Sequence, residues 1–436
     1  MIPRFLLVSL NIDTILGEVT ISDRRQKLNE MAKGNQLGDA YATTIARMRS
    51  QKGSRSRLGM EALMWVSNSE RPLHTTELCH ALGVKIGSAD LDVENVPTIR
   101  TLLACTLGLI TVEASSSTVR LVHFSLQEYL SDNQSLFQSP HSMIAEVCLT
   151  YLNFRCVREL LPTLSSAPAT VPLAGYASIY WGRHIRRGEM ECVSTLALGL
   201  LTEFEQHISS QLLMLHYDES RLWREPVFDK TGGPKGFTGL HGAAFFGIVE
   251  IVAMLLAMKE WDINATDGRG RTALAWAAVG GHEDAVAILL QEKDVKANTQ
   301  DTKRGLTPLC LAAVKGHEGV AKLLLGREDV NPNTADIKDS QTPLALATVE
   351  GHEGVVKLLL AREDINPNTA DTMNGRTPLA LAAVEGHEGV VKLLLAREDM
   401  NPNTADTEGS TPLALAAEKG YEGISVPNGP GRPGRG

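Results

Sequence analysis

The chain has 436 residues, of which 43% are hydrophobic and 21% charged, a composition that suits folded domains and excludes a largely disordered chain. Its formal charge of −9 is unevenly placed, since residues 236–422 hold 17 Lys and Arg against 27 Asp and Glu. An acidic half is unsuited to nucleic acid or anionic membrane, which bind basic surfaces. No run of about 18 apolar residues occurs, so we expect no membrane-spanning helix.

Three helix signals and two β-rich runs follow one another between residues 57 and 132. Apolar residues recur at helical spacing in 58–66, a threonine suited to an N-cap opens 75–82, and 96–105 has a proline near its start. Two β-rich runs within 108–124 are joined by a short polar turn and predict a hairpin. Three helices followed by a hairpin is the order of a winged-helix domain.

A winged helix can bind DNA through its third helix, and the charges around this one argue against that role. The predicted helix carries a single base, Arg100, and it is preceded by Asp90, Asp92 and Glu94. This acidic pattern would repel phosphate. A DNA-binding regulator therefore stays as an alternative function, and nucleic acid is not an expected partner.

This region also resembles a known domain. The segments 65–73, 77–82 and 120–130, the last reading Arg-Leu-Val-His-Phe-Ser-Leu-Gln-Glu-Tyr-Leu, are similar to the winged helix that follows the NACHT nucleotide-binding module in fungal signal-transduction ATPases with ankyrin repeats. These are STAND-type proteins, and the same winged helix occurs in proteins labelled GPI inositol-deacylase-like. The resemblance implies that residues 1–50 are a remnant of the NACHT C-terminal helical region and that residues 140–235 form a helical linker region.

One histidine of the predicted winged helix has two interpretations. His123 takes the place of a histidine that contacts the ADP phosphate in relatives, so the resemblance implies nucleotide sensing there if a NACHT module is supplied. The alternative is a strand-end histidine that is hydrogen-bonded locally. Trp65, Tyr129 and Trp181 stand among apolar residues at helical spacing and are expected in the core.

The sequence lacks the motifs that nucleotide or ester hydrolysis requires. No Gly-x-x-x-x-Gly-Lys-Ser/Thr occurs, and residues 232–236 have neither the loop length nor the hydroxyl of a phosphate-binding loop. No Gly-x-Ser-x-Gly nucleophile elbow occurs either. We therefore expect no enzymatic activity and no cofactor, and a residual nucleotide-binding ATPase fragment is the remaining alternative.

A threonine-led box recurs in the C-terminal half at a period of 34 or 35 residues. The six boxes begin at Thr238, Thr272, Thr307, Thr342, Thr377 and Thr411. Each is followed by Gly-His or a variant, an apolar helix such as 355–360 and a polar stretch such as 366–371. Threonine and proline suit a helix start and glycine suits a helix end, so each unit predicts helix, turn, helix and loop.

This pattern resembles the ankyrin repeat, whose hallmark is Thr-Pro-Leu-His-x-Ala-Ala followed by Gly-His. The resemblance covers residues 236–422, about five full repeats and one partial repeat, and a disordered tail is expected at 423–436. Only His241 keeps the hallmark histidine, so most repeats lose the threonine-to-histidine bond. We expect a mostly α chain in which a small winged-helix (α+β) domain and a helical linker precede an ankyrin-repeat α-solenoid.

A solenoid offers a long surface, and its expected role is to bind a protein partner. By the resemblance, the hairpin tips and first helices form the concave binding face. The tips vary between repeats and supply the candidate contacts, with solvated loop polarity as the alternative interpretation. The candidates are Arg269, Arg271, Lys303, Arg304, Lys338, Asp339, Met373, Asn374, Arg376 and Glu408.

Two further expectations concern histidines and cysteines. His282, His317, His352 and His387 stand once per repeat at a turn, which favours a structural role over metal binding. The six cysteines include no CxxC pair, so we expect reduced thiols in a cytoplasmic protein. A NACHT-containing protein acting in trans is a second partner that the resemblance implies.

Overall fold

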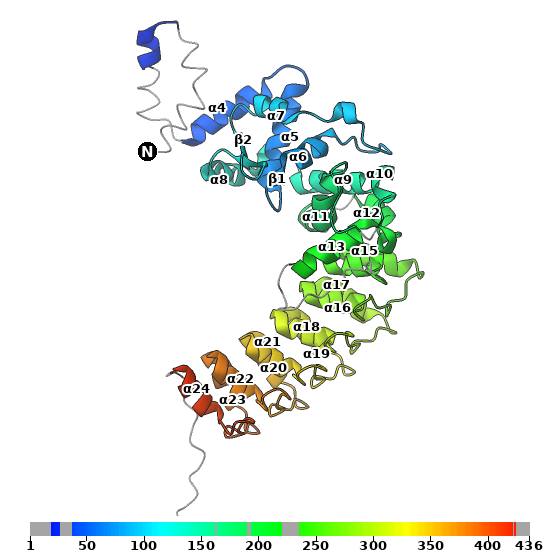
Figure 1. The fold of residues 1–436 in the computed structure, drawn as a ribbon, viewed down its shortest axis with the longest axis vertical. Helices are drawn as coiled ribbons and strands as arrows, with labels where there is room; N and C mark the ends of the chain where they lie inside the picture. Colours follow the sequence, from blue (N-terminus) through cyan, green and yellow to red (C-terminus); the bar gives the residue numbers. More distant parts are fainter. Residues whose placement is uncertain are drawn as a thin grey trace, which may run out of the picture. The chain divides into compact units, whose positions relative to one another are not determined.

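The computed structural model describes residues 19–26, 37–161, 164–189, 193–219, 235–421 and 423, and its contacts divide the chain into two compact units (Figure 1). Unit 1 is Met1–Gly233 and unit 2 is Pro234–Gly436. Much of the segment interpreted as a NACHT remnant, namely 1–18 and 27–36, lies outside the described residues. The interpretation of 423–436 as a disordered tail also lies outside them, apart from Gly423.

The winged-helix order predicted for unit 1 is confirmed. Helices α5, α6 and α7 precede the antiparallel hairpin of β2 and β3, in which Ile110 lies opposite Leu121, and α8 follows. Strand β1 pairs with the other edge of β3 and completes a three-stranded sheet in the order β1-β3-β2. The bounds are α5 Ser54–Asn68, β1 Leu73–His74, α6 Thr75–Gly83, α7 Ile99–Cys105, β2 Ile110–Glu113, β3 Thr118–Leu121 and α8 Phe124–Asp132.

Two details of this domain differ from the prediction. Strand β1 was not predicted, because a two-residue strand is too short to show an alternating pattern. The third helix begins at Ile99 and not at Val96, because Pro97 keeps its neighbour extended and the hydroxyl of Thr98 accepts the N–H of Thr101 as an N-cap.

The helical linker region packs against the winged helix within unit 1. Its helix α11 lies against α9, α13 and α6, and Tyr176 of α11 meets Trp65 of α5 edge to face with 6.1 Å between ring centroids. Trp65 and Trp181 are buried, as predicted, whereas Tyr129 is half-buried against Tyr41 of α4. The bounds are α4 Leu37–Arg49, α9 Pro140–Leu152, α10 Arg155–Arg158, α11 Leu173–Arg187, α12 Ser194–Leu201 and α13 Ile208–Glu219.

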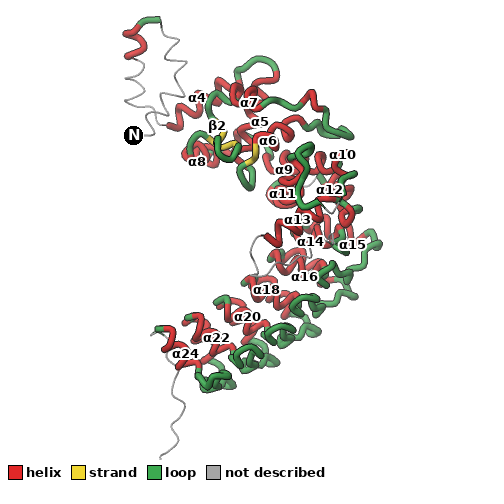
Figure 2. Tube along the Cα trace, in the orientation of Figure 1, coloured by secondary structure: helices red, strands yellow, loops and turns green. Residues whose placement is uncertain are grey.

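Unit 2 is a stack of helix pairs, as the repeat pattern predicts (Figure 2). The first helix of each pair packs against the first helix of the next, and the second helices form their own row. The pairs are α14 Gly239–Phe246 with α15 Val249–Ala257, α16 Ala273–Gly280 with α17 Glu283–Gln291, α18 Pro308–Lys315 with α19 Glu318–Leu325, α20 Pro343–Val349 with α21 Glu353–Leu360, and α22 Pro378–Glu385 with α23 Glu388–Leu395, and α24 Pro412–Lys419 follows.

The local chemistry of the repeats matches the prediction. In the box of Thr342, the hydroxyl accepts the N–H of Ala345 and Pro343 occupies the first helical position. The threonine-to-histidine contact of the family survives at Thr238 and His241, with 2.8 Å between Oγ1 and Nδ1. Where alanine replaces this histidine, the threonine still caps its helix, so the loss of the contact does not remove the helix start.

Histidines and asparagines tie each repeat to its neighbour. Nε2 of the four turn histidines lies 2.8 to 3.1 Å from a carbonyl of the preceding repeat, and for His352 this is the carbonyl of Val314. Asn333 donates through Nδ2 to the carbonyl of Asp364 and accepts the N–H of Asn366 in the next repeat. Equivalent bonds are made by Asn264, Asn298 and Asn368. The structural role predicted for the histidines is confirmed.

Candidate functional site

Each hairpin tip of unit 2 is built on one buried aspartate. Oδ1 of Asp301 accepts the N–H groups of Arg304 and Leu306, at 2.8 and 3.3 Å. The tip of Asp406 has the same design, and the N–H groups of Ser410 and Glu408 lower the pKa of its carboxyl. The remaining members of this set are Asp267, Asp336 and Asp371.

Several predicted partner contacts hold the array together. Arg271 reaches Asp301 of the next repeat at 3.2 Å and lies over the ring of Trp276, and its side chain is 6% exposed. Arg269 is also buried. The prediction that these two side chains contact a partner is therefore corrected, because burial removes them from the surface. Arg304 and Arg376 make the same pair with Asp336 and Asp406, at 3.1 and 3.3 Å, and keep about a fifth of their surface exposed.

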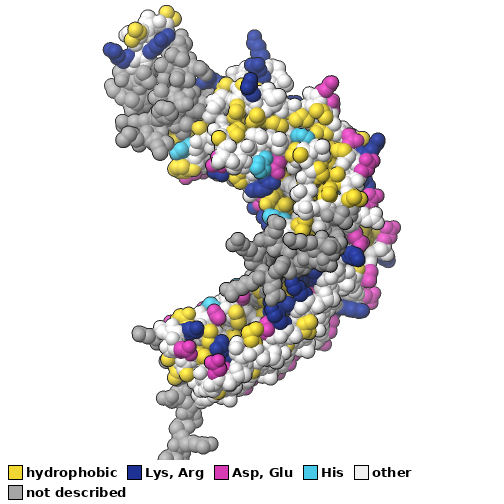
Figure 3. All heavy atoms as spheres, in the orientation of Figure 1, with side chains coloured by type: hydrophobic (Ala, Val, Ile, Leu, Met, Phe, Trp, Pro, Cys, Tyr) yellow, Lys and Arg dark blue, Asp and Glu magenta, His cyan; other side chains and the backbone are white. Residues whose placement is uncertain are grey.

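The exposed candidates occupy one position in four successive tips. Lys303, Lys338, Met373 and Glu408 each follow the buried aspartate by two residues, and we call these four residues the outer tip row. Asp339 stays close to Arg304, at 3.7 Å, and Asn374 is half-buried with its N–H bonded to Asp371. On the face drawn in Figure 3, Lys and Arg side chains gather near α18.

One exposed tip residue was missed from the sequence. Ile337 is 65% exposed, as is Met373 in the next tip. The available signal was its position, because Ile337 directly follows the aspartate where other repeats carry Gly268, Thr302 or Thr372. A single exposed apolar residue is common on protein surfaces, and Ile337 and Met373 place one in each of two successive tips.

His123 of unit 1 is the N-cap of α8. Its Nδ1 accepts the N–H of Ser125 at 3.2 Å, and the hydroxyl of Ser125 lies 2.7 Å from the same nitrogen and 2.9 Å from that of Tyr41. The neutral ring therefore carries its proton on Nε2. The local hydrogen bonding is confirmed, and the nucleotide-sensing role stays a prediction.

A hollow of about 450 Å³ lies beside His123. Phe124, which is 70% exposed, lines it, with its ring centroid 4.3 Å from that of His123. The two arginines at its rim are both paired, Arg71 with Glu77 through two bonds of 2.6 and 2.8 Å and Arg120 with Glu113 at 2.9 Å. The hollow therefore combines the exposed ring of Phe124 with arginines that are already paired to glutamates.

Comparisons with known proteins agree with this geometry. Three copies of the model for ankyrin repeats match residues 211–301, 293–371 and 363–425, and the model for the GPI inositol-deacylase winged helix domain matches residues 45–141. The chain carries ankyrin repeats and a GPI inositol-deacylase winged helix domain. The winged helix match takes in the end of α4, and the ankyrin match starts inside α13. A comparison with curated proteins found no match.

Two searches bear on other kinds of site. None of the described helices combines the length and the apolar character needed to span a bilayer. Within the same described ranges, no three His, Cys, Asp or Glu side chains gather as metal ligands would.

Proposed function

We propose that this chain is a non-catalytic scaffold that binds a protein partner through its ankyrin repeats. Ankyrin repeats generally mediate binding between proteins, and the outer tip row is the single observation that carries the proposal for this chain. The buried aspartates and the ladders between repeats fix the frame, whereas Lys303, Lys338, Met373 and Glu408 vary in chemistry at one exposed position.

The tip residues specify the chemistry of the partner surface. Two lysines come first along the array, followed by methionine and then glutamate, with Ile337 beside the second lysine. A complementary partner would place acidic side chains against the lysines and apolar side chains against Ile337 and Met373. Because the rest of the array is acidic, the two lysines also set the orientation of that partner.

We place this scaffold in a signalling protein of the fungal NACHT and ankyrin type, as its recognition and regulatory part in the cytoplasm. The winged helix supports this proposal, since such a domain accompanies the NACHT module in the proteins that it resembles. Phe124 and the hollow beside His123 would then contact a NACHT module, supplied in trans by another protein. No bond-making step is assigned to the chain.

The test compares partner recovery between two sets of substitutions of exposed residues. The tip variant is K303A/K338A/M373A/E408A, and the control variant, K322A/K357A/K392A, changes exposed residues on the second helices. We expect the tip variant to recover at least tenfold less of the proteins that wild type binds after crosslinking in cells, and the control to match wild type. Equal recovery by all three would overturn the proposed surface, and ATP hydrolysis by the purified chain would overturn the non-catalytic role.

A further inference from the structure

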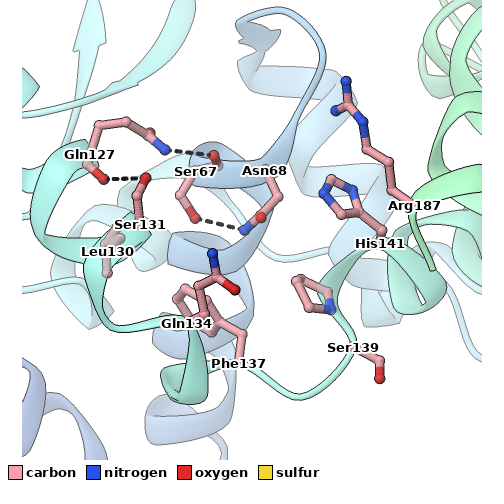
Figure 4. A pocket seen from close by; sticks show the side chains of 11 residues that line it. Ser67, Asn68, Gln127, Leu130, Ser131, Gln134, Phe137, Ser139, His141 and Arg187 are labelled. Carbon is pink, nitrogen blue, oxygen red and sulfur yellow. Dashed lines mark hydrogen bonds between the residues drawn. The ribbon is translucent and has the colours of Figure 1, made fainter. Parts of the chain in front are cut away.

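A polar cavity of about 500 Å³ lies in unit 1, where the end of α5, helix α8 and the start of α9 meet the last turn of α11 (Figure 4). Its position and its lining differ from those of the ankyrin surface. Figure 4 shows His141 and Arg187 on one side and Gln127, Ser131 and Gln134 on the other. None of the described residues that line it is acidic, although the chain has an excess of carboxylates.

A chain of hydrogen bonds reaches this cavity from the core. The N–H of Glu70 donates to the hydroxyl oxygen of Tyr176 at 3.1 Å, and Nε2 of His184 lies 2.8 Å from the same oxygen. Tyr176 is fully buried, so its hydroxyl hydrogen needs an acceptor, and Nε2 of His184 is within reach. His184 then carries its proton on Nδ1, which lies 2.9 Å from Nδ1 of His141.

This series of hydrogen bonds determines which ring nitrogen of His141 carries a proton. Nδ1 of His141 accepts the proton of His184, so the neutral ring of His141 carries its own proton on Nε2. Nε2 of His141, which lines the cavity, is therefore a hydrogen-bond donor. His184 is fully buried, and burial lowers its pKa to about 3, so its ring is neutral. The direction of these hydrogen bonds is therefore the same across the physiological pH range.

Arg187 adds positive charge to the same wall. Its Nη1 lies 2.5 Å from Oε1 of Glu70, and Arg183 approaches Oε2 of that glutamate at 3.5 Å. Two guanidinium groups share one carboxylate, so Glu70 does not fully neutralise them, and of the two only Arg187 lines the cavity. The side chain of Arg187 is 56% exposed, so it is accessible to a ligand.

The opposite wall offers acceptors. Nδ2 of Asn68 donates to the carbonyl of Met64 and to Ser67, and Nε2 of Gln127 donates to the carbonyl of Ser67. With their N–H groups directed there, the side-chain oxygens of both residues have no partner in the described part of the chain. These oxygens are suited to accept hydrogen bonds from hydroxyl groups.

We propose that this cavity binds a small hydroxylated anion, a sugar phosphate or a sugar acid. The acid group lies against Arg187 and the Nε2–H of His141, and the hydroxyl groups donate to Asn68 and Gln127. The volume suits such a ligand. The site does not use the outer tip row, and of the four residues assigned to the ligand only Gln127 also lines the hollow beside His123.

Calorimetric titrations of the full chain with three probes test the site. We expect glucose 6-phosphate or glucuronate to bind and glucose, which lacks the acid group, to bind at least tenfold more weakly. If only glucose 6-phosphate binds, the acid group of the ligand is a phosphate, and if only glucuronate binds, it is a carboxylate. Failure of both acids to bind at millimolar concentration, or equal binding of glucose, would overturn the proposal.

A pair of arginine variants locates the binding. Arg183 and Arg187 both pair with Glu70 and are equally exposed, and only Arg187 lines the cavity. We expect R187Q to weaken binding of the acid at least tenfold and R183Q to change it less than threefold. Equal effects of the two variants would assign the binding to charge alone and contradict the site.

The role of Tyr176 as a positioning residue has a spectroscopic test. The variant Y176F keeps the ring and removes the hydroxyl that directs the chain of hydrogen bonds. We expect the ring ¹⁵N signals of His141 to show loss of the Nε2–H tautomer and acid binding to weaken several-fold. An unchanged tautomer with unchanged binding would contradict this role, and a loss of stability alone would not move the tautomer.

Discussion

At the scale of single residues, unit 1 depends on histidines that are kept neutral. Burial lowers the pKa of His184 to about 3 and that of His207 to about 4. His207 donates from Nε2 to the carbonyl of Leu152 and accepts the N–H of Ser209 at Nδ1, so both nitrogens are used in the neutral form. A proton on either ring would break one of these bonds.

This gives a pH dependence with a definite sign. Between about pH 6.5 and 4 the unfolded chain binds protons at His184 and His207 that the folded chain does not, so the free energy of unfolding decreases as the pH falls. The expected slope is roughly 1.4 kcal/mol per pH unit for each histidine. Urea unfolding of unit 1 at pH 7, 6 and 5, compared with H184Q and H207Q, measures it, and a variant slope equal to wild type would contradict the assignment.

The roles of single residues were predicted well where the sequence of one repeat contains the signal. The helix caps and the turn histidines follow from local sequence. Arg271 was misassigned because its partner, Asp301, stands one repeat later in the chain. A charged side chain in a loop is usually solvated, and only the stacking of repeats brings this carboxylate to it. The recurrence of arginine about 30 residues before aspartate was the signal that could have identified the pair.

At the scale of elements, the asparagine ladder is expected to carry much of the coupling between repeats. Asn333 makes two bonds to the next repeat, whereas Asn331 bonds through its side chain to the N–H of Asn333 within its own repeat. We expect N333A to lower the free energy of unfolding of the array by about 2 kcal/mol and N331A by about 1 kcal/mol or less. Urea denaturation of both variants checks this, and equal losses would mean that the ladder adds no stability of its own.

The glycine after α20 leaves room for the histidine ring of the next repeat. Gly351 has φ of 73°, and a Cβ placed there would lie 2.7 Å from the ring of His387. G351A should cost about 2 to 3 kcal/mol, the sum of left-handed strain and the displaced ring.

A double-mutant cycle isolates the part due to His387. In G351A/H387A the added methyl group no longer meets a ring, and the hydrogen bond from His387 to Val349 is lost only once. The stability loss of the double variant should therefore be smaller than the sum of the two single losses by at least about 1 kcal/mol. Additive effects in urea denaturation would show that ring and glycine are not coupled.

The elements themselves were largely predictable, and the cavity was not. The repeats, the three helices and the hairpin each follow from a local pattern of apolar residues and turns. The cavity combines Asn68, Gln127, His141 and Arg187 from four different helices. Each of these residues is unremarkable in its own segment, so packing of the winged helix against the linker helices was needed to reveal the site.

At the scale of the whole molecule, stability is expected to vary along the array. Leu344 and Leu379 of the threonine boxes are fully buried, whereas the equivalent Leu413 of α24 is 41% exposed. L344A should therefore cost about 3 kcal/mol and L413A under about 1 kcal/mol. Hydrogen exchange should show protection that falls from the middle repeats to α24, and uniform protection would contradict an array that is stabilised by neighbouring contacts.

The ladders between repeats also bear on how such an array can change its length. The three repeats that begin at Thr272, Thr307 and Thr342 carry both an asparagine that bonds to the next repeat and a histidine that bonds to the preceding one, so a copied unit of this kind brings its own connections to both neighbours. Segments 352–364 and 387–399 are identical, as a copying event would leave them. Genes of this design can therefore gain or lose a whole module in one recombination step, with later mutations free to change only the tips.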